Sequence, residues 1–190
     1  MIRFPERQRN RAWARLLLRL VLLAVVSGVA AVGIAEVSKE FQLKAVFLWR
    51  LAQFTEWPAD AFESAANPIV ICVLGEDPFG DALDSAVENE TAHGRRLIVQ
   101  RHRSIDQMRN CHILYLSAAF ARRPRDIVNA LAGKSVLTVS DGLPSANTYD
   151  SIVRFITEQN KIRLRIDVKA AAAAGLVLDP RLLRAAEIAG

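Results

Sequence analysis

The sequence predicts an α/β fold: a three-layer α/β/α sandwich on a mostly parallel, open sheet, with an antiparallel hairpin near the carboxyl terminus. Three observations lead to this fold class. Short apolar runs alternate along the chain with segments of helical periodicity, which is the order of elements in open α/β sheets. The first such run, IVICVL at residues 69–74, is apolar throughout, as expected of a strand buried on both faces. Residues 161–168 instead alternate between apolar and charged side chains, which indicates one solvated face.

Four strands of the parallel sheet are expected, each a short apolar run bounded by polar residues. They cover residues 69–74, 97–101, 111–116 and 135–139. In the commonest five-strand order of such sheets, the first and third strands are neighbours. The strand that contains Cys72 is therefore expected beside the strand that contains Cys111.

Helices are expected before and between these strands. The first covers residues 41–57 and ends at Pro58. Its apolar residues recur on one face at helical spacing, namely Leu43, Phe47, Leu51 and Phe54. A second helix covers residues 78–88, with Asp77 as its N-cap. A helical turn at 104–109 and a helix at 124–131, with Gly133 after it, complete this part of the chain.

The carboxyl-terminal part is predicted to leave the parallel pattern. A loop at 141–151 leads into two strands, 152–158 and 161–168, which the turn Gln159-Asn160 joins as a hairpin. This hairpin is expected to form an antiparallel edge of the sheet. A last helix begins at Asp179-Pro180, a second N-cap followed by proline, and extends to Ile188.

Residues 1–35 have the three parts of a secretory signal peptide. Six arginines and one glutamate accompany an apolar run from Leu16 to Val32, and Gly33-Ile34-Ala35 supplies small residues for cleavage. There is no twin-arginine pair in this segment, so a Sec-type route to the periplasm is expected. An uncleaved anchor is the alternative, but a spanning helix needs about 20 apolar residues and the run after Arg19 is shorter. Residues 36–190, about 155 residues, are expected to form a single α/β domain.

The net charge of the full chain is +5 at pH 7. This excess lies in the arginine-rich leader, so the chain without the leader is close to neutral. A basic surface is the usual requirement for nucleic-acid binding, and we therefore expect no nucleic acid among the partners.

Cys72 and Cys111 are predicted to form a disulfide. An exported chain with a small, even number of cysteines usually pairs them, and here one pairing is possible. The apolar, strand-like surroundings favour a structural bridge over a redox-sensitive clip, and both interpretations stay open.

His112 next to Cys111 suggests a metal site as a further alternative. Secreted zinc sites usually show tighter ligand clusters, so we expect no metal.

No pattern of catalytic or cofactor-binding residues is found in the sequence. The loop after the first strand, Gly75 to Ala82, has two glycines, but Asp81-Ala82 stands where a phosphate loop needs lysine and a hydroxyl. A nucleophile elbow of the form G-x-S-x-G is also missing. The three histidines, His93, His102 and His112, show no pairing at i+3 or i+4. We therefore expect no catalytic residue, no cofactor and no enzyme activity.

Two features of the surface could take part in binding. Lys161, Arg163 and Arg165 form a basic stripe on the solvated face of the hairpin, either as a docking surface for an acidic partner or as a charged edge that discourages aggregation. Three aromatic residues of the first helix could line a ligand pocket, although burial in the core is their more common role. These residues are Trp49, Phe54 and Trp57.

The assembled motifs resemble the YfiR family of periplasmic repressors. The resemblance runs from about Phe41 to about Ala189. It rests on the stretches KAVFLWRLAQFTEWP, PIVICVLGEDPFGDAL, GRRLIVQR, NCHILYLS, VLTVSDG and RLLRAA in this order. Cys72 and Cys111 match the family's cysteine pair at these motifs.

The resemblance implies a periplasmic, non-enzymatic homodimer with an α/β sandwich fold. Such a protein binds the periplasmic domain of an inner-membrane diguanylate cyclase and represses it, which lowers cyclic di-GMP and biofilm formation. An outer-membrane lipoprotein relieves the repression by sequestering the repressor. The alternative function is a periplasmic small-molecule binding module that serves a sensor kinase or a transporter.

Two features depart from the family pattern. The best-studied type of member has a second cysteine pair around the loop at 141–151, and this chain has none there. Tyr149-Asp150-Ser151-Ile152 stands where the family favours Gly-Gly-Met-Ile. Redox control through the second pair is therefore not available to this protein.

Overall fold

A computed structural model describes residues 39–142 and 149–189. The chain divides into two units, Met1–Glu40 and Phe41–Gly190, and the second is the α/β unit described below. The predicted signal peptide lies outside the described residues.

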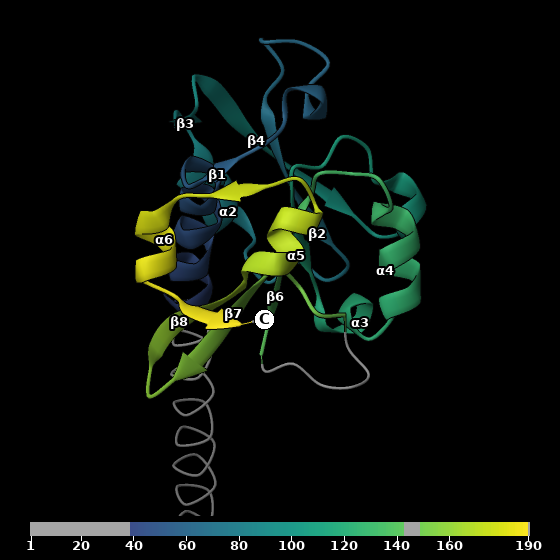
Figure 1. Cartoon of the computed structure of the whole chain (residues 1–190). Helices are drawn as coiled ribbons and strands as arrows, with labels where there is room; N and C mark the ends of the chain where they lie inside the picture. Colours follow the sequence, from purple (N-terminus) through teal and green to yellow (C-terminus); the bar gives the residue numbers. More distant parts are fainter. Residues whose placement is uncertain (1–38, 143–148, 190) are drawn as a thin grey trace, which may run out of the picture. The chain divides into compact units, whose positions relative to one another are not determined.

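Within the described residues, eight strands form one sheet in the order β10-β8-β7-β6-β5-β2-β4-β3 (Figure 1). The strands are β2 Ile69–Leu74, β3 Thr91–Ala92, β4 Arg95–His102, β5 Ile113–Leu116, β6 Leu137–Asp141, β7 Val153–Glu158, β8 Lys161–Asp167 and β10 Glu187–Ala189. The neighbours from β4 to β7 pair in parallel, whereas β3 pairs antiparallel with β4 and β8 with β7. A separate antiparallel pair joins β1 Thr55–Glu56 to β9 Val177–Leu178.

Helices cover both faces of the sheet, so the unit is a three-layer sandwich as predicted (Figure 1). One face packs against the first helix (residues 39–53), α2 Asp81–Val87, α5 Val168–Ala173 and α6 Pro180–Arg184. The other face packs against the 3-10 turn η2 Ile105–Gln107, α3 Ala118–Ala121 and α4 Pro124–Leu131. The other 3-10 turn, η1 Ala59–Ala61, follows β1.

Strand β2 shows why the central sequence is apolar throughout. Its alternate residues face the two cores, with Ile69, Ile71 and Val73 on the side of the first helix and Val70, Cys72 and Leu74 on the other. All six are buried. Strand β5 lies beside β2, which confirms the predicted neighbourhood of the first and third parallel strands.

The first helix differs from the prediction in its end and its buried face. It ends at residue 53, because the backbone of Thr55–Glu56 pairs with β9 and Phe54 accepts a hydrogen bond from the Asp179 N–H. Leu43, which the periodicity assigned to the buried face, is 49% exposed. The buried stripe holds Lys44, Ala45, Leu48, Leu51 and Ala52. Leu51 of the predicted face is buried, and Phe47 and Phe54 are partly buried against the core, so the predicted face is wrong only at Leu43. The apolar pattern missed the buried Lys44.

Helix α2 begins at Asp81, three residues later than predicted. The Asp77 carboxylate accepts a hydrogen bond from the Phe79 N–H, so it closes a turn ahead of the helix. Gly80, with φ +51°, then supplies the N-cap position.

The carboxyl terminus also corrects the prediction. Asp179 caps α6 as expected, because its side chain accepts a hydrogen bond from the Arg181 N–H. The helix ends at Arg184, however, and Glu187–Ala189 form β10, which pairs in parallel with Arg165–Asp167 of β8. The hairpin β7–β8 with its Gln159-Asn160 turn is confirmed, but β10 follows β8 in the sheet order, so β8 is not its last strand. Residues 143–148 of the predicted loop lie outside the described residues.

Candidate functional site

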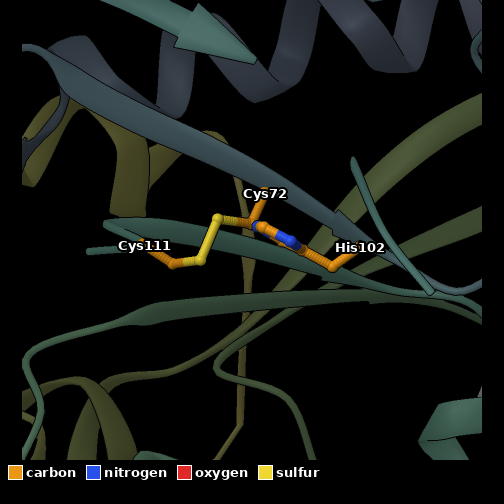
Figure 2. A group of neighbouring side chains, drawn as sticks. All are labelled: Cys72, His102 and Cys111. Carbon is orange, nitrogen blue, oxygen red and sulfur yellow. A yellow bond between two sulfur atoms is a disulfide. The ribbon is translucent and has the colours of Figure 1, made fainter. Parts of the chain in front are cut away.

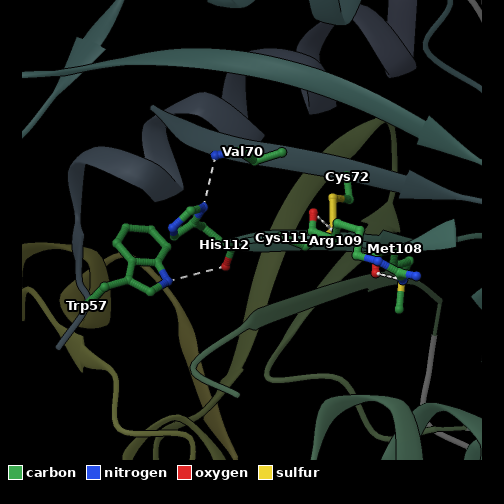
Figure 3. Close-up of a disulfide and its surroundings, with 7 residues drawn as sticks. All are labelled: Trp57, Val70, Cys72, Met108, Arg109, Cys111 and His112. Atoms are coloured by element: carbon green, nitrogen blue, oxygen red, sulfur yellow. Dashed lines mark hydrogen bonds between the residues drawn. A yellow bond between two sulfur atoms is a disulfide. The ribbon is translucent and has the colours of Figure 1, made fainter. Parts of the chain in front are cut away.

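The two cysteines form a disulfide between neighbouring parts of the sheet. Cys72 lies in the middle of β2 and is fully buried, and Cys111 lies two residues before β5 (Figure 3). Their Cα atoms are 5.8 Å apart, and the bond spans a sequence separation of 39. Both side chains belong to the core under α3 and α4. The sequence predicted this pairing from the even number of cysteines in an exported chain, and the expected strand order agreed with it.

His112, the histidine that the sequence suggested as a metal ligand, is engaged in hydrogen bonds to the backbone. Its Nδ1 accepts a hydrogen bond from the Val70 N–H at 3.1 Å (Figure 3). Nε2 therefore carries the proton and donates to the Ala61 carbonyl at 3.1 Å. The ring of Phe62 stacks on it with centroids 4.4 Å apart. Burial lowers the pKa of His112, which agrees with a neutral ring. Both ring nitrogens are occupied, so His112 is not available as a ligand.

His102, which the sequence did not single out, is the histidine next to the disulfide (Figure 2). It is the last residue of β4 and pairs in register with Leu74 of β2. One of the two ring nitrogens of His102 and the two sulfur atoms all lie within 4.8 Å of one another. The Nε2 atom is buried and has no hydrogen-bond partner among the described residues. Burial lowers the pKa of His102.

A cavity of about 510 Å³ opens beside Cys111. Its lining carries two basic side chains, Arg109 and Lys134, and one acidic one, Asp60. A second cavity of about 560 Å³ shares Lys134 and its neighbours with the first and extends between α4 and α5. Ala170 and Ala173 of α5 and Ala174, its C-cap, line this cavity. Small side chains there leave the space open, which gives the run of alanines at 170–174 a structural role.

A partly buried ion pair lies at the carboxyl-terminal end of β6, and sequence reasoning did not find it. The Lys44 ammonium is 2.5 Å from one carboxylate oxygen of Asp141, and the Tyr115 hydroxyl donates to the other. The rings of Phe41 and Phe155 lie 4.9 Å and 5.8 Å from the ammonium. The cluster ties the first helix to the sheet. Lys44 and Asp141 are 97 residues apart in sequence, so no local pattern could indicate the pair.

The predicted basic stripe lies on β8. Lys161 and Arg163 are exposed, whereas Arg165 is half-buried beside Glu187 of β10 in the register of the sheet. Arg165 also stands opposite Arg154 of β7, whose side chain is buried and ion-paired with Asp150. The exposed part of the stripe therefore consists of Lys161 and Arg163, and Arg165 at its end is partly covered.

The three aromatic residues of the first helical segment contribute to the core. Trp49, Phe54 and Trp57 are partly buried and pack against the core beneath the first helix. The Trp57 ring also donates a hydrogen bond to the His112 carbonyl at 3.3 Å (Figure 3). Packing thus accounts for these side chains without a ligand.

One protein family matches the chain. The model of the family described as YfiR/HmsC-like matches residues 41–187, which is well over half of the sequence. None of the curated proteins matches the chain. In residues 39–142 and 149–189, no helix is long and apolar enough to cross a membrane.

Proposed function

The chain belongs to the YfiR/HmsC-like family, and we propose that it is an exported, non-enzymatic regulator of a membrane diguanylate cyclase. The resemblance to the YfiR family implies a periplasmic protein with a regulatory rather than a catalytic role. In the proposed mechanism, a homodimer binds the periplasmic domain of the cyclase and favours its inactive state, which lowers cyclic di-GMP. The observation that carries this proposal is the family match over nearly the whole α/β unit.

The exposed part of β8 is the proposed docking surface. Lys161 and Arg163 project from a strand whose pairing with β10, among the described residues, begins at Arg165. Residues 161–164 therefore offer two cations and a stretch of strand edge toward a partner. An acidic segment of the cyclase domain would complement the charge, and its backbone could pair with the strand edge.

The test is carried out in the host cell. Deletion of the gene is expected to raise intracellular cyclic di-GMP, and the wild-type gene is expected to restore the lower level. Arg163→Glu should fail to restore it, because the reversed charge repels an acidic partner. Arg125→Glu, the same charge change at an exposed position of α4, is the matched control and should restore it fully.

Two results would contradict the proposal at different points. Unchanged cyclic di-GMP after deletion would exclude repression of a cyclase. Full restoration by Arg163→Glu, with a deletion effect present, would exclude the β8 surface but leave the repressor function standing. The melting temperatures of both variants show whether each protein is folded.

The adjoining cavities favour a second candidate function, the binding of a small molecule. Lys134 and Arg109 line the first cavity, so the ligand would be a small anion with an apolar part that reaches between α4 and α5. This function predicts saturable binding of a metabolite to the purified protein alone. Ala173→Leu would fill the second cavity and weaken that binding, whereas Ala172→Leu on the exposed side of α5 is the matched control.

A further inference from the structure

The Nε2 atom of His102 is a buried polar atom that the fold does not explain. Buried ring nitrogens normally have a hydrogen-bond partner, and one without a partner costs free energy. Among the described residues this atom has none, and a ring nitrogen of the same His102 lies within 4.8 Å of both sulfur atoms of the disulfide. A ring nitrogen next to two cysteine sulfurs is the donor set of a site for a thiophilic metal ion.

We propose that reduction of the Cys72–Cys111 disulfide creates a metal site, in which the two thiolates and a ring nitrogen of His102 bind Zn²⁺. The three ligands come from adjacent parts of one sheet (Figure 2). Gln100 pairs with Cys72 and Leu74 pairs with His102, so Cys72 and His102 lie on the same face of neighbouring strands. Cys111 precedes β5, the strand that pairs with β2 along the edge opposite β4. Its sulfur reaches the same face of the sheet, because the disulfide joins it to Cys72.

The distances suit a metal ion of this kind. Zinc–sulfur bonds are about 2.3 Å long and zinc–nitrogen bonds about 2.0 Å, which puts neighbouring ligand atoms roughly 3.5 Å apart in a tetrahedral site. The three ligand atoms already lie within 4.8 Å of one another. Opening the sulfur–sulfur bond lets the two sulfurs separate to that spacing by side-chain rotation. Three protein ligands leave a fourth position for water.

The chemistry balances with a dithiol as the reductant. The dithiol gives two electrons and two protons to the disulfide and becomes a disulfide itself, and Cys72 and Cys111 become thiols. Zinc binding then releases one proton from each thiol and leaves the oxidation state of the metal unchanged.

The reductant can reach the disulfide from one side. Cys72 is fully buried, but Cys111 lines the cavity of about 510 Å³ together with Arg109 and Lys134. These two cations favour the thiolate form of an approaching dithiol. Attack at the Cys111 sulfur breaks the bond and releases Cys72 as a thiolate, which lies beside His102.

The experiment uses the purified protein and Co²⁺ as a spectroscopic probe for the zinc site. The protein is reduced with a phosphine, freed of the reductant without air, and titrated with Co²⁺. Reduced wild-type protein should give a thiolate-to-cobalt charge-transfer band that Zn²⁺ abolishes, and oxidised protein should give none. His102→Gln should weaken binding by about 10-fold or more. His93→Gln, an exposed histidine away from the disulfide, is the matched control and should bind as the wild type does.

Two outcomes would overturn the site. One is the lack of the charge-transfer band in reduced wild-type protein. The other is equal affinity of the wild type and His102→Gln, which would show that the cysteines bind the metal without the histidine. Circular dichroism of the reduced protein accompanies the titration, because binding by an unfolded chain would also be independent of His102.

Discussion

At the scale of single residues, Lys44 shows how a charge can belong to a core. Its side chain is 4% exposed and faces Asp141, between two phenylalanine rings. A buried ammonium is tolerated only when an opposite charge and hydrogen bonds compensate for lost hydration. Hydropathy assigns Lys44 of the first helix to the surface, although the residue is buried. Its burial requires Asp141, which comes from the other half of the chain.

Asp141→Asn should destabilise the protein by about 3 kcal/mol, because a buried ammonium then faces a neutral amide. Urea denaturation measures the change in the free energy of unfolding. The matched control is Asp126→Asn, which breaks the exposed pair with Arg123 and should cost less than about 0.5 kcal/mol. Similar small losses in both variants would contradict the structural role of the Lys44–Asp141 pair.

Two histidines, the buried His112 and the partly buried His102, should make the stability depend on pH. Burial lowers the pKa of His112 and of His102 from the ordinary value of 6.5. At a pH between the lowered pKa of the folded histidine and 6.5, the unfolded chain binds protons that the folded protein does not. The free energy of unfolding therefore falls as the pH drops below about 6.5. Protonation of His112 at Nδ1 would also break the hydrogen bond from Val70.

Denaturation at about pH 7.5 and about pH 5.5 tests this prediction. The loss of stability on acidification should be smaller in His112→Gln than in the wild type, because glutamine does not titrate. An equal loss in the two proteins would show that His112 does not contribute to the pH dependence.

At the scale of elements, the turn after β2 depends on a glycine. Gly75 has φ +98°, a conformation that residues with a Cβ atom rarely adopt. A Cβ atom there would come 2.8 Å from the Phe120 ring and would also overlap the Ser117 hydroxyl. Its N–H donates to the His102 carbonyl at 2.9 Å, so the turn also fixes the end of β4 beside the disulfide.

Gly75→Ala should lower the free energy of unfolding by about 2–4 kcal/mol, since strain and overlap add. Gly94→Ala is the matched control. That glycine also has a positive φ of +75°, but no described atom lies within 4 Å of the added Cβ. It should cost about 1 kcal/mol. Equal melting temperatures of the two variants would exclude the overlap at Gly75.

Some helices and strands could be predicted from a local sequence pattern, and others could not. Strand β2 and helix α4 have the bounds that the sequence predicted, because a continuous apolar run and the Pro124 and Gly133 signals fix them locally. The end of the first helix and strand β10 were not predicted. Residues 55–56 and 187–189 are extended because distant strands offer them backbone partners. His102 was missed for the same reason, since strand register brings it to the sulfurs.

At the scale of the whole molecule, the disulfide joins the centre of the sheet to the segment that leads into β5. It lies in the core beneath α3 and α4, which is the smaller of the two apolar cores among the described residues. A cross-link stabilises a fold chiefly by restricting the unfolded chain, and more so when the loop it closes is long.

The double variant Cys72→Ala/Cys111→Ala should lose about 4 kcal/mol of stability and melt at a lower temperature. Calorimetry of the oxidised wild type, the reduced wild type and the variant measures the effect. The variant and the reduced protein should resemble each other in the absence of metal ions. An unchanged melting temperature in the variant would exclude a structural role for the bridge.

The sequence by itself determined the layers, the central strands, the partnership of the two cysteines and the family resemblance. These features depend on local periodicity, on turn residues and on short motifs, which the order of amino acids states directly. Tertiary structure alone decided the Lys44–Asp141 pair, the position of His102, the strand β10 and the cavities beside Cys111. Each of these joins residues that are far apart in the chain, and strand order and register, rather than sequence spacing, determine which of them meet.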